Sequence, residues 1–542
     1  MRHGGQILVD QLLIQGVDRV FSIPGESYLA ALDGLYESSI DVIVGRQEGG
    51  VAMMAEAHGK LTGKPGIAFV TRGPGATNAS AGVHIALQDS TPMVLFVGQV
   101  ASDQRDREAF QEVDYRQMFA PLAKWVAEIE RTDRIPEYVS RAFHVAQSGR
   151  PGPVVLALPE DMLSAEVHVQ DTYEAIPAKQ MVSYQAVRDV IERLKSAKNP
   201  FVIVGGGGWS TQAAIDLGRF ASSLGLAVGT SFRCQDYMDN RHPNYVGDVA
   251  ISPNPELAER VRNADCVLVL GARLGEMTSS GYTLFKVPNP KQKLIHVHAG
   301  PDELGRVYQP EIGLACRAAD FVAVAAKLTK GMVQKSPIHA KESYTKWQEP
   351  FETPGDVKME EVICHMKDVL PDNAIIANGA GNYAGWIHRY YSFRSYRTQL
   401  APTSGSMGYG LPAAIAAKLQ YPEREVICLA GDGCFQMTMQ EFGTALQYGI
   451  KLIVIVVNNG VYGTIRMHQQ RDYPGRPSGT TIVNPNFADF AACYGCSGVI
   501  VTKTKDFNSA LERARSAKKS TIIELRTDPT AVTTKSTVFK SF

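Results

Sequence analysis

Two short polar turns in the C-terminal third of the chain carry residue types suited to metal and phosphate chemistry. The apolar run VICLA at 426–430 leads into Gly431-Asp432-Gly433, and the apolar run LIVIVV at 452–457 leads into Asn458-Asn459. If both runs are buried parallel strands, their polar ends meet at one edge of a sheet, where open α/β proteins collect ligands.

A metal-bound diphosphate requires such residues. Asp432 offers a carboxylate oxygen and Asn459 an amide oxygen, and both are hard donors that a divalent cation such as Mg2+ prefers. The flanking glycines let backbone N–H groups approach phosphate oxygens, and a following helix directs its positive end at them. Either turn alone is more simply a strand-to-helix connection. Both turns together, each after a buried strand, predict a cofactor site.

The segment GDGCFQMTMQEFGTALQYGIKLIVIVVNNGVYGTIRMHQQ, residues 431–470, resembles the corresponding stretch of acetohydroxyacid (acetolactate) synthases, which use thiamine diphosphate. The resemblance implies that Asp432 and Asn459 bind the metal together with the main-chain oxygen of Val461. It also implies a set of residues that line the diphosphate: Gly433, Cys434, Gly463 and Thr464, with Gly381 and Asn382 from the upstream stretch NGAGNYAGW.

Glu48 is the candidate catalytic residue. It follows the predicted strand DVIVG at 41–45 and opens a helical stretch, where an isolated acid is common because it interacts favourably with the helix dipole. The segment RQEGGVAMMAEAHGKL, however, resembles the glutamate loop of the same family. That resemblance implies that Glu48 hydrogen-bonds N1′ of the aminopyrimidine and favours the imino tautomer that removes the C2 proton.

Met407 lies in the stretch Gly405-Ser406-Met407-Gly408. A methionine before a glycine-rich helix is often only a core filler. The resemblance implies instead that Met407, next to Gly405, wedges between the two rings of the cofactor and holds it bent.

The resemblance covers nearly the whole chain and includes 71–100 and 109–119. In the synthases, the positions that match Phe110, Gln111 and Lys124 lie near the substrate. By themselves these residues suggest a core phenylalanine and a surface lysine. Glu26 is expected at the mouth of the thiazolium site, or else is a helix N-terminal acid. His468 is either a proton-transfer group or a surface histidine.

Two segments depart from the synthases and leave the substrate open. Leu274-Gly275-Glu276-Met277 stands where the family has an arginine that grips a carboxylate, and methionine cannot replace that bidentate partner. Thr464 to Gln469, TIRMHQ, stands where the family has a selecting tryptophan. We expect decarboxylation of a 2-oxo acid followed by carboligation. The enzymatic alternative is a lyase on 2-hydroxy ketones or 2-hydroxyacyl-CoA, towards which GARLGEMTSSGYTLF and HAGPDELGR lean.

A non-catalytic, regulatory thiamine-diphosphate binder is a further alternative, and Glu48 argues against it because a pure binder has no need to activate the cofactor. The run Gly205 to Gly208 raises the question of FAD, which several relatives bind in their middle domain. A lone glycine run is a weak signal, and residues 231–252 lack the match to the synthases. FAD is therefore the less expected outcome.

Short β-branched runs alternate with amphipathic stretches along the chain and predict βαβ units with parallel sheets. Polar breaks that contain single prolines divide the chain into three doubly wound α/β domains. Their expected ranges are 1–165 (pyrimidine-binding), 183–330 (central) and 355–530 (diphosphate-binding), in the arrangement of pyruvate oxidase and pyruvate decarboxylase that the resemblance implies. The endings LPED and RTDP of the first and third domains hint at an internal duplication.

Composition excludes several partners. Lysine plus arginine and aspartate plus glutamate number 55 each, which gives no global field for nucleic acid or an anionic membrane, and no apolar run could span a bilayer. Eight scattered cysteines without a second C-x-x-C predict free thiols in a reducing, cytoplasmic compartment. The resemblance implies a homodimer as the smallest active unit, with a homotetramer expected.

Overall fold

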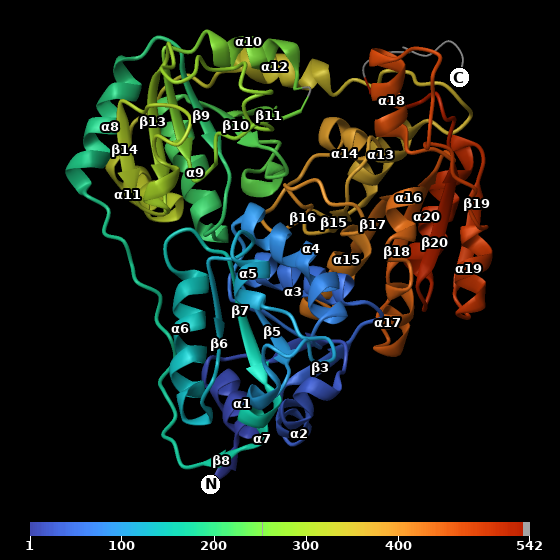
Figure 1. Ribbon diagram of the computed structural model, residues 1–542. Helices are drawn as coiled ribbons and strands as arrows, with labels where there is room; N and C mark the ends of the chain where they lie inside the picture. Colours follow the sequence, from blue (N-terminus) through green and yellow to red (C-terminus); the bar gives the residue numbers. More distant parts are fainter. Residues whose placement is uncertain (252, 535–542) are drawn as a thin grey trace. The chain divides into compact units, whose positions relative to one another are not determined.

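The computed structural model describes residues 1–251 and 253–534, and within these residues it contains three parallel sheets of six strands each (Figure 1). The predicted class, three doubly wound parallel-sheet α/β domains, is confirmed. The chain forms two compact units, the first built from 1–179, 404–422 and 435–452 and the second from the remaining segments. The exact domain boundaries stay a prediction.

The first sheet belongs to the first unit, and its strands are rich in buried β-branched and aromatic residues. In spatial order the strands are β3 (Asp41–Val44), β2 (Arg19–Ser22), β4 (Gly66–Val70), β5 (Met93–Gln99), β7 (Pro153–Pro159) and β6 (Trp125–Glu128). The connecting helices are α1 (Gly4–Ile14), α2 (Leu29–Tyr36), α3 (Glu48–Thr62), α4 (Pro74–Asp89), α5 (Tyr115–Phe119), α6 (Ile135–Gln147) and α7 (Glu160–Ser164). The turn η1 (Glu26–Tyr28) follows β2, and β1 (Arg2–His3) pairs antiparallel with β8 (Glu166–Val167).

Two helices from the C-terminal part of the chain, α15 (Gly410–Gln420) and α17 (Glu441–Gln447), also belong to the first unit. Helix α15 packs against α3, and the hydroxyl of Tyr409 donates a hydrogen bond of 2.5 Å to the fully buried Glu56. Burial raises the pKa of Glu56. Helices α3 and α4 approach closely because Gly82 faces Ala52, where an added Cβ would lie 2.4 Å from the alanine Cβ.

The second sheet lies in the second unit. Its strands are β11 (Tyr245–Val249), β10 (Ala227–Ser231), β9 (Pro200–Val204), β12 (Cys266–Leu270), β13 (Lys293–His298) and β14 (Ile312–Ala315). Its helices are α8 (Tyr184–Ser196), α9 (Thr211–Leu224), α10 (Pro255–Arg262), α11 (Ala318–Leu328) and α12 (Ile338–Trp347). Counted along the chain, the order is 3-2-1-4-5-6, the order of dinucleotide-binding sheets.

The third sheet lies in the same unit. Its strands are β16 (Gln399–Leu400), β15 (Ile375–Asn378), β17 (Val426–Gly431), β18 (Ile453–Asn458), β20 (Thr521–Arg526) and β19 (Ser497–Val501). The associated helices are α13 (Met359–Val369), α14 (Ala384–Tyr390), α16 (Asp432–Gln436), α18 (Gly463–Asp472), α19 (Phe487–Cys493) and α20 (Phe507–Ser516). The order along the chain is 2-1-3-4-6-5, identical to that of the first sheet, which agrees with the suggested duplication.

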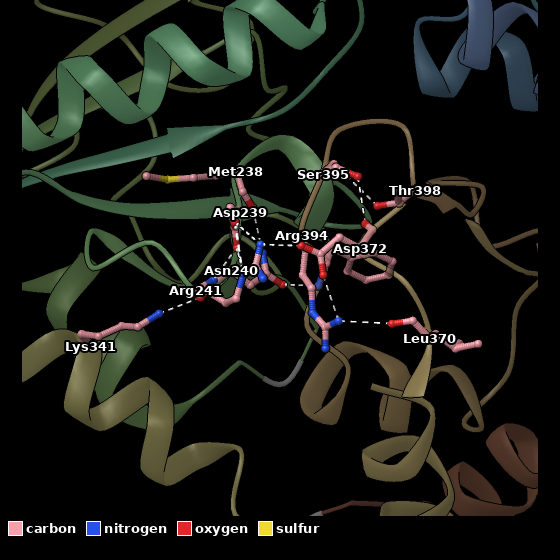
Figure 2. A network of polar contacts seen from close by, with 11 residues as sticks. Met238, Asp239, Asn240, Arg241, Lys341, Leu370, Asp372, Arg394, Ser395 and Thr398 are labelled. Atoms are coloured by element: carbon pink, nitrogen blue, oxygen red, sulfur yellow. Dashed lines mark hydrogen bonds and ion pairs between the residues drawn. The ribbon is translucent and has the colours of Figure 1, made fainter. Parts of the chain in front are cut away.

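A polar network links the second and third sheets of this unit. Figure 2 shows Arg241 and Arg394 converging on Asp372, with contacts of 2.8 and 3.1 Å. The buried Asn240 exchanges backbone and side-chain hydrogen bonds with Phe393. The exposed ion pairs contribute about 0–1 kcal/mol each, so the buried Asn240 is the stronger part of the link.

Two further observations concern location. The eight cysteines are free thiols. Across residues 1–251 and 253–534, no helix has both the length and the apolar character needed to cross a bilayer.

Candidate functional site

Asp432 is the centre of the polar cluster in the third sheet. It follows β17 directly and is only 4% exposed. One carboxylate oxygen accepts a hydrogen bond of 2.8 Å from Gly433 N, and the other accepts bonds from Gly460 N (2.8 Å) and Asn484 Nδ2 (2.7 Å). Burial raises the pKa of Asp432, and these hydrogen bonds lower it. All three donors are uncharged, so a cation bound here would offset the buried negative charge.

The loop after β18 lies beside Asp432, as the two-turn pattern predicts. Gly460, in the left-handed region at φ 67°, places its N–H on the Asp432 carboxylate, and Asn459 Oδ1 accepts a hydrogen bond of 3.1 Å from Val461 N. Among the residues that the structure describes, no three His, Cys, Asp or Glu side chains form a metal-binding group. One carboxylate with amide and main-chain oxygens suits Mg2+, which keeps several waters and needs few protein ligands.

Asn484 is a site residue that sequence reasoning missed. Its amide nitrogen lies 2.7 Å from the Asp432 carboxylate and 2.8 Å from Asn458 Oδ1, so it fixes the end of β17 to the end of β18. It stands in the irregular segment VNPN, where no strand or glycine pattern marks it. Only the three-dimensional contact reveals its part in the site.

The residues expected around the diphosphate are brought together in the second unit. Thr464, in the first turn of α18, donates a hydrogen bond of 2.8 Å to Asn382 Oδ1. The hydroxyl of Tyr383 donates to Cys434 Sγ at 3.3 Å, and Gly381 has a φ of 143° that favours glycine. An added Cβ at Gly433 would lie 2.6 Å from the Tyr462 ring. Gly463 is less confined, since its Cβ would make an ordinary contact of 3.4 Å with Asn459 Nδ2.

Glu48 is the first residue of α3 and is half-buried in the first unit. Its Oε2 accepts a hydrogen bond of 2.9 Å from Asn78 Nδ2 on α4. The side chain of Gln47 caps the helix by accepting from Gly50 N at 3.1 Å. Glu48 is therefore held at a helix N-terminus, where the dipole favours a negative charge.

Glu441 supports the loop that carries Glu48, and sequence reasoning missed it as well. Its buried carboxylate accepts hydrogen bonds of 3.0 Å from the backbone N–H groups of Arg46 and Gln47, and one of 2.7 Å from the Thr444 hydroxyl. Burial raises the pKa of Glu441, and these bonds lower it. Gly50 makes room for it, because an added Cβ would lie 2.6 Å from Glu441 Oε1.

Met407 and Gly405 also belong to the first unit, together with Glu48. Gly405 has a φ of 69°, and the carbonyl of the neighbouring Gly408 accepts a hydrogen bond of 2.7 Å from the Thr438 hydroxyl. Met407 is half-buried rather than part of the core. A partly exposed methionine on a fixed turn is consistent with a contact to a bound group, as the resemblance implies.

Three of the expected substrate residues gather near Arg72, which sequence reasoning did not single out. Arg72 Nη2 donates to Glu26 Oε1 at 3.0 Å, and the guanidinium carbon lies 6.0 Å from the centroid of the Phe110 ring. Phe110 is 71% exposed, so it is not a core residue. Gln111 packs on the residue after Arg72, since a Cβ on Gly73 would lie 2.9 Å from the Gln111 Cβ.

The other two expected substrate residues lie elsewhere. The Lys124 ammonium donates to the carbonyls of Val145 and Ser148 and so caps the C-terminal end of α6. His468 is half-buried on α18, and its neighbour Met467 contacts Asn382 through sulfur at 3.7 Å. Substrate roles for Lys124 and His468 stay predictions.

The first two glycines of the run that follows β9 are explained by packing. Added Cβ atoms on Gly205 and Gly206 would lie 1.9 Å from the Ser231 hydroxyl and the Gly271 carbonyl oxygen. The carbonyls of the same glycines accept hydrogen bonds from Trp209 Nε1 (2.8 Å) and the Tyr237 hydroxyl (2.6 Å). Close contact therefore accounts for Gly205 and Gly206.

Comparison with known proteins agrees with this geometry. Three models of thiamine pyrophosphate enzymes match the chain: the N-terminal TPP binding domain at 2–118, the central domain at 187–324 and the C-terminal TPP binding domain at 379–525. The chain is 31% identical to the acetolactate synthase large subunit of Corynebacterium glutamicum over 94% of this chain and 84% of that protein. It is 30% identical to that of Haemophilus influenzae (97% and 94%) and 28% identical to isozyme 2 of Escherichia coli (94% and 93%).

Proposed function

Because this chain belongs to the thiamine pyrophosphate enzymes, we propose that it decarboxylates a 2-oxo acid and joins the remaining fragment to a carbonyl acceptor, as an acetolactate-synthase-like carboligase. The observation that carries the proposal is Asp432, a buried carboxylate at a strand end whose hydrogen-bond donors are all uncharged. Such a group fits a site that holds a divalent cation and, through it, a diphosphate.

The residues have distinct tasks. Asp432, Asn459 and the main-chain oxygen of Val461 would bind Mg2+, while Gly433, Cys434, Gly463, Thr464, Gly381 and Asn382 would line the diphosphate. Thiamine diphosphate supplies a nucleophilic carbon and an electron sink when it is bound. Glu48, oriented by Asn78 at the start of α3, would share a proton with N1′ of the aminopyrimidine. Met407 and Gly405 would support the bent shape of the cofactor.

The test is an assay of the purified protein with thiamine diphosphate, Mg2+ and pyruvate, in which both CO2 and acetolactate are followed. We expect both products, and we expect Glu48→Gln to lower turnover by about 100-fold or more, the usual scale for a proton-transfer group. Cofactor affinity should be retained, because Glu48 lies outside the metal-binding loops. Turnover near the wild-type rate in Glu48→Gln would refute its assigned role.

A second candidate function is favoured by one observation, the absence of an arginine from Leu274-Gly275-Glu276-Met277. A lyase that cleaves a 2-hydroxy ketone or a 2-hydroxyacyl-CoA has no second 2-oxo acid to hold. Such an enzyme would release no CO2 from pyruvate and would form an aldehyde from a 2-hydroxy ketone such as benzoin.

The remaining properties are part of the same proposal. We propose Mg2+ as the metal, a homodimer as the minimum unit with a homotetramer expected, and no requirement for FAD. The free thiols support a cytoplasmic location. Light scattering coupled to size exclusion, and a visible spectrum without flavin absorption in active protein, would test the assembly and the FAD statement.

A further inference from the structure

We propose that Arg72 is the receptor for the carboxylate of the substrate and that Glu26 is its exchangeable counter-ion. This inference rests on the proposed function, because it assumes a 2-oxo acid substrate. At Leu274 to Met277 the chain lacks the arginine that binds a substrate carboxylate in the synthases. A 2-oxo acid still needs a cationic partner, and Arg72 would provide it.

Arg72 is a buried cation at the strand ends of the first sheet. It comes two residues after β4, and its side chain is 10% exposed. The guanidinium makes ion pairs with Glu26, in the turn after β2, and with Glu160, the first residue after β7. All three residues therefore lie at the carboxyl ends of parallel strands, where sheets of this class bind ligands.

The two carboxylates differ in how firmly they are held. The Glu26 side chain is 67% exposed and the Glu160 side chain 39%. Glu26 can move into water at little cost to itself, because most of its side chain is already exposed. A substrate carboxylate that takes its place keeps the charge balance of the cluster, one cation against two anions. The exchange therefore leaves the buried guanidinium with two carboxylate partners, as before.

The segment that carries Arg72 also contacts the catalytic residue. Asn78, on α4, hydrogen-bonds Glu48 at 2.9 Å, and an added Cβ on Gly75 would lie 3.5 Å from Glu48 Oε1 and 2.9 Å from the Thr71 methyl group. The short turn at 71–75 thus contains Arg72 and also contacts Glu48. A carboxylate on Arg72 lies against the same turn as Glu48.

Arg19 offers a matched control on the same sheet. Its side chain is 13% exposed and pairs at 3.3 Å with Asp41, whose side chain is 65% exposed. Burial and pairing are therefore close to those of Arg72 and Glu26. Arg19, however, begins β2, so it lies at the opposite, amino-terminal edge of the strands. Replacing it removes a similar ion pair, between a buried guanidinium and an exposed carboxylate, without touching the candidate site.

The experiment measures pyruvate binding by calorimetry in the Glu48→Gln protein loaded with thiamine diphosphate and Mg2+, so that turnover does not interfere. We compare Arg72→Met, Arg72→Lys, Glu26→Gln and Arg19→Met in that background. Arg72→Met should raise the pyruvate Kd by about 10- to 100-fold, the range for a lost hydrogen-bonded charge. Arg72→Lys should raise the Kd by an intermediate amount. Lysine keeps the positive charge but lacks the planar guanidinium that binds a carboxylate through two parallel hydrogen bonds. Arg19→Met should change Kd by less than about twofold.

Glu26→Gln keeps the proposal testable if Arg72→Met fails to fold, because Glu26 is exposed. It should lower the pyruvate Kd by about two- to fivefold, the scale of a weak exposed ion pair. No detectable binding of pyruvate, equal effects of Arg72→Met and Arg19→Met, or weaker binding in Glu26→Gln would each overturn the assignment. If wild-type protein releases no CO2 while the Arg72 effect on binding persists, the proposed function fails and this inference stands.

Discussion

The first and third sheets share one strand order but present opposite charges at equivalent strand ends. The third strand along the chain is β4 in one sheet and β17 in the other; Arg72 lies two residues after β4, and Asp432 directly follows β17. Both side chains are buried. Arg72 is paired with carboxylates, whereas Asp432 accepts hydrogen bonds only from uncharged donors. The comparison teaches that one topology can place a buried guanidinium at one strand end and a buried carboxyl group at the equivalent one, so the residue type at the strand end decides the local charge.

The largest expected effect is that of Asp432→Asn, which replaces the carboxylate at the end of β17 by a neutral amide. Thiamine diphosphate with Mg2+ should stabilise wild-type protein by about 2.7 kcal/mol at 100 times the Kd, and the variant should lose this stabilisation and its activity. Thermal unfolding with and without the cofactor measures it. Asp489→Asn, an exposed change on α19, is the control. Full cofactor stabilisation of Asp432→Asn would mean that the metal is held elsewhere.

Asn484→Ala tests the same site more gently, because Asn484 hydrogen-bonds the Asp432 carboxylate and orients it without carrying a charge. Loss of its hydrogen bonds to Asp432 and Asn458 should weaken Mg2+ affinity by about 10- to 100-fold. A titration of activity against Mg2+ gives the value. Asn486→Ala, two residues away, removes the N-cap of α19 and should lower stability by about 1 kcal/mol without altering Mg2+ affinity. If the two variants behaved alike, Asn484 would be merely structural.

Gly50→Ala tests how the first sheet holds Glu48. The added Cβ meets Glu441 Oε1, so the carboxylate must leave the N–H groups of Arg46 and Gln47, and we expect a loss of about 1–3 kcal/mol in the free energy of unfolding. Urea unfolding measures it. Gly218→Ala on α9, whose Cβ would have ordinary contacts of 3.5 Å, should instead stabilise by about 0.5–1 kcal/mol. Stabilisation in both variants would remove the argument for Glu441.

The smallest expected effect comes from Arg241→Ala, which breaks exposed ion pairs that involve neither Arg72 nor Asp432. Arg241 pairs with Asp239 and Asp372 at 2.8 Å each, and its side chain is 55% exposed (Figure 2). The free energy of unfolding should fall by about 0–1 kcal/mol, with less effect at high salt. A loss above about 2 kcal/mol would show that surface pairing, rather than Asn240, carries the link between the sheets.

Much of the site was predictable because its signals are local. Strand-ending turns with Asp432 and Asn459, and the acid Glu48 after a strand, can be recognised within a few residues. The structure brings Asp432 beside the 458–461 loop and Thr464 beside Asn382, as expected. Phe110 was less readable, since an aromatic in a loop suggests a core residue, yet here it is exposed. Long side chains such as Lys124 are also ambiguous, because their charged end can reach several places.

The sequence by itself determined the alternation of strands and helices and the polar turns with Asp432 and Asn459, because hydrophobic periodicity and turn chemistry act over a few neighbouring residues. The cofactor class followed from the resemblance of segments such as 431–470 to a known family. Only the tertiary structure decided which distant groups complete the site. Asn484 reaches Asp432 across 52 positions, Glu441 reaches Arg46 across 395, and Glu160 and Glu26 meet at Arg72. Parallel sheets join strand ends that are far apart in the chain. Strand order therefore decides which distant residues become neighbours, and no local sequence pattern records that order.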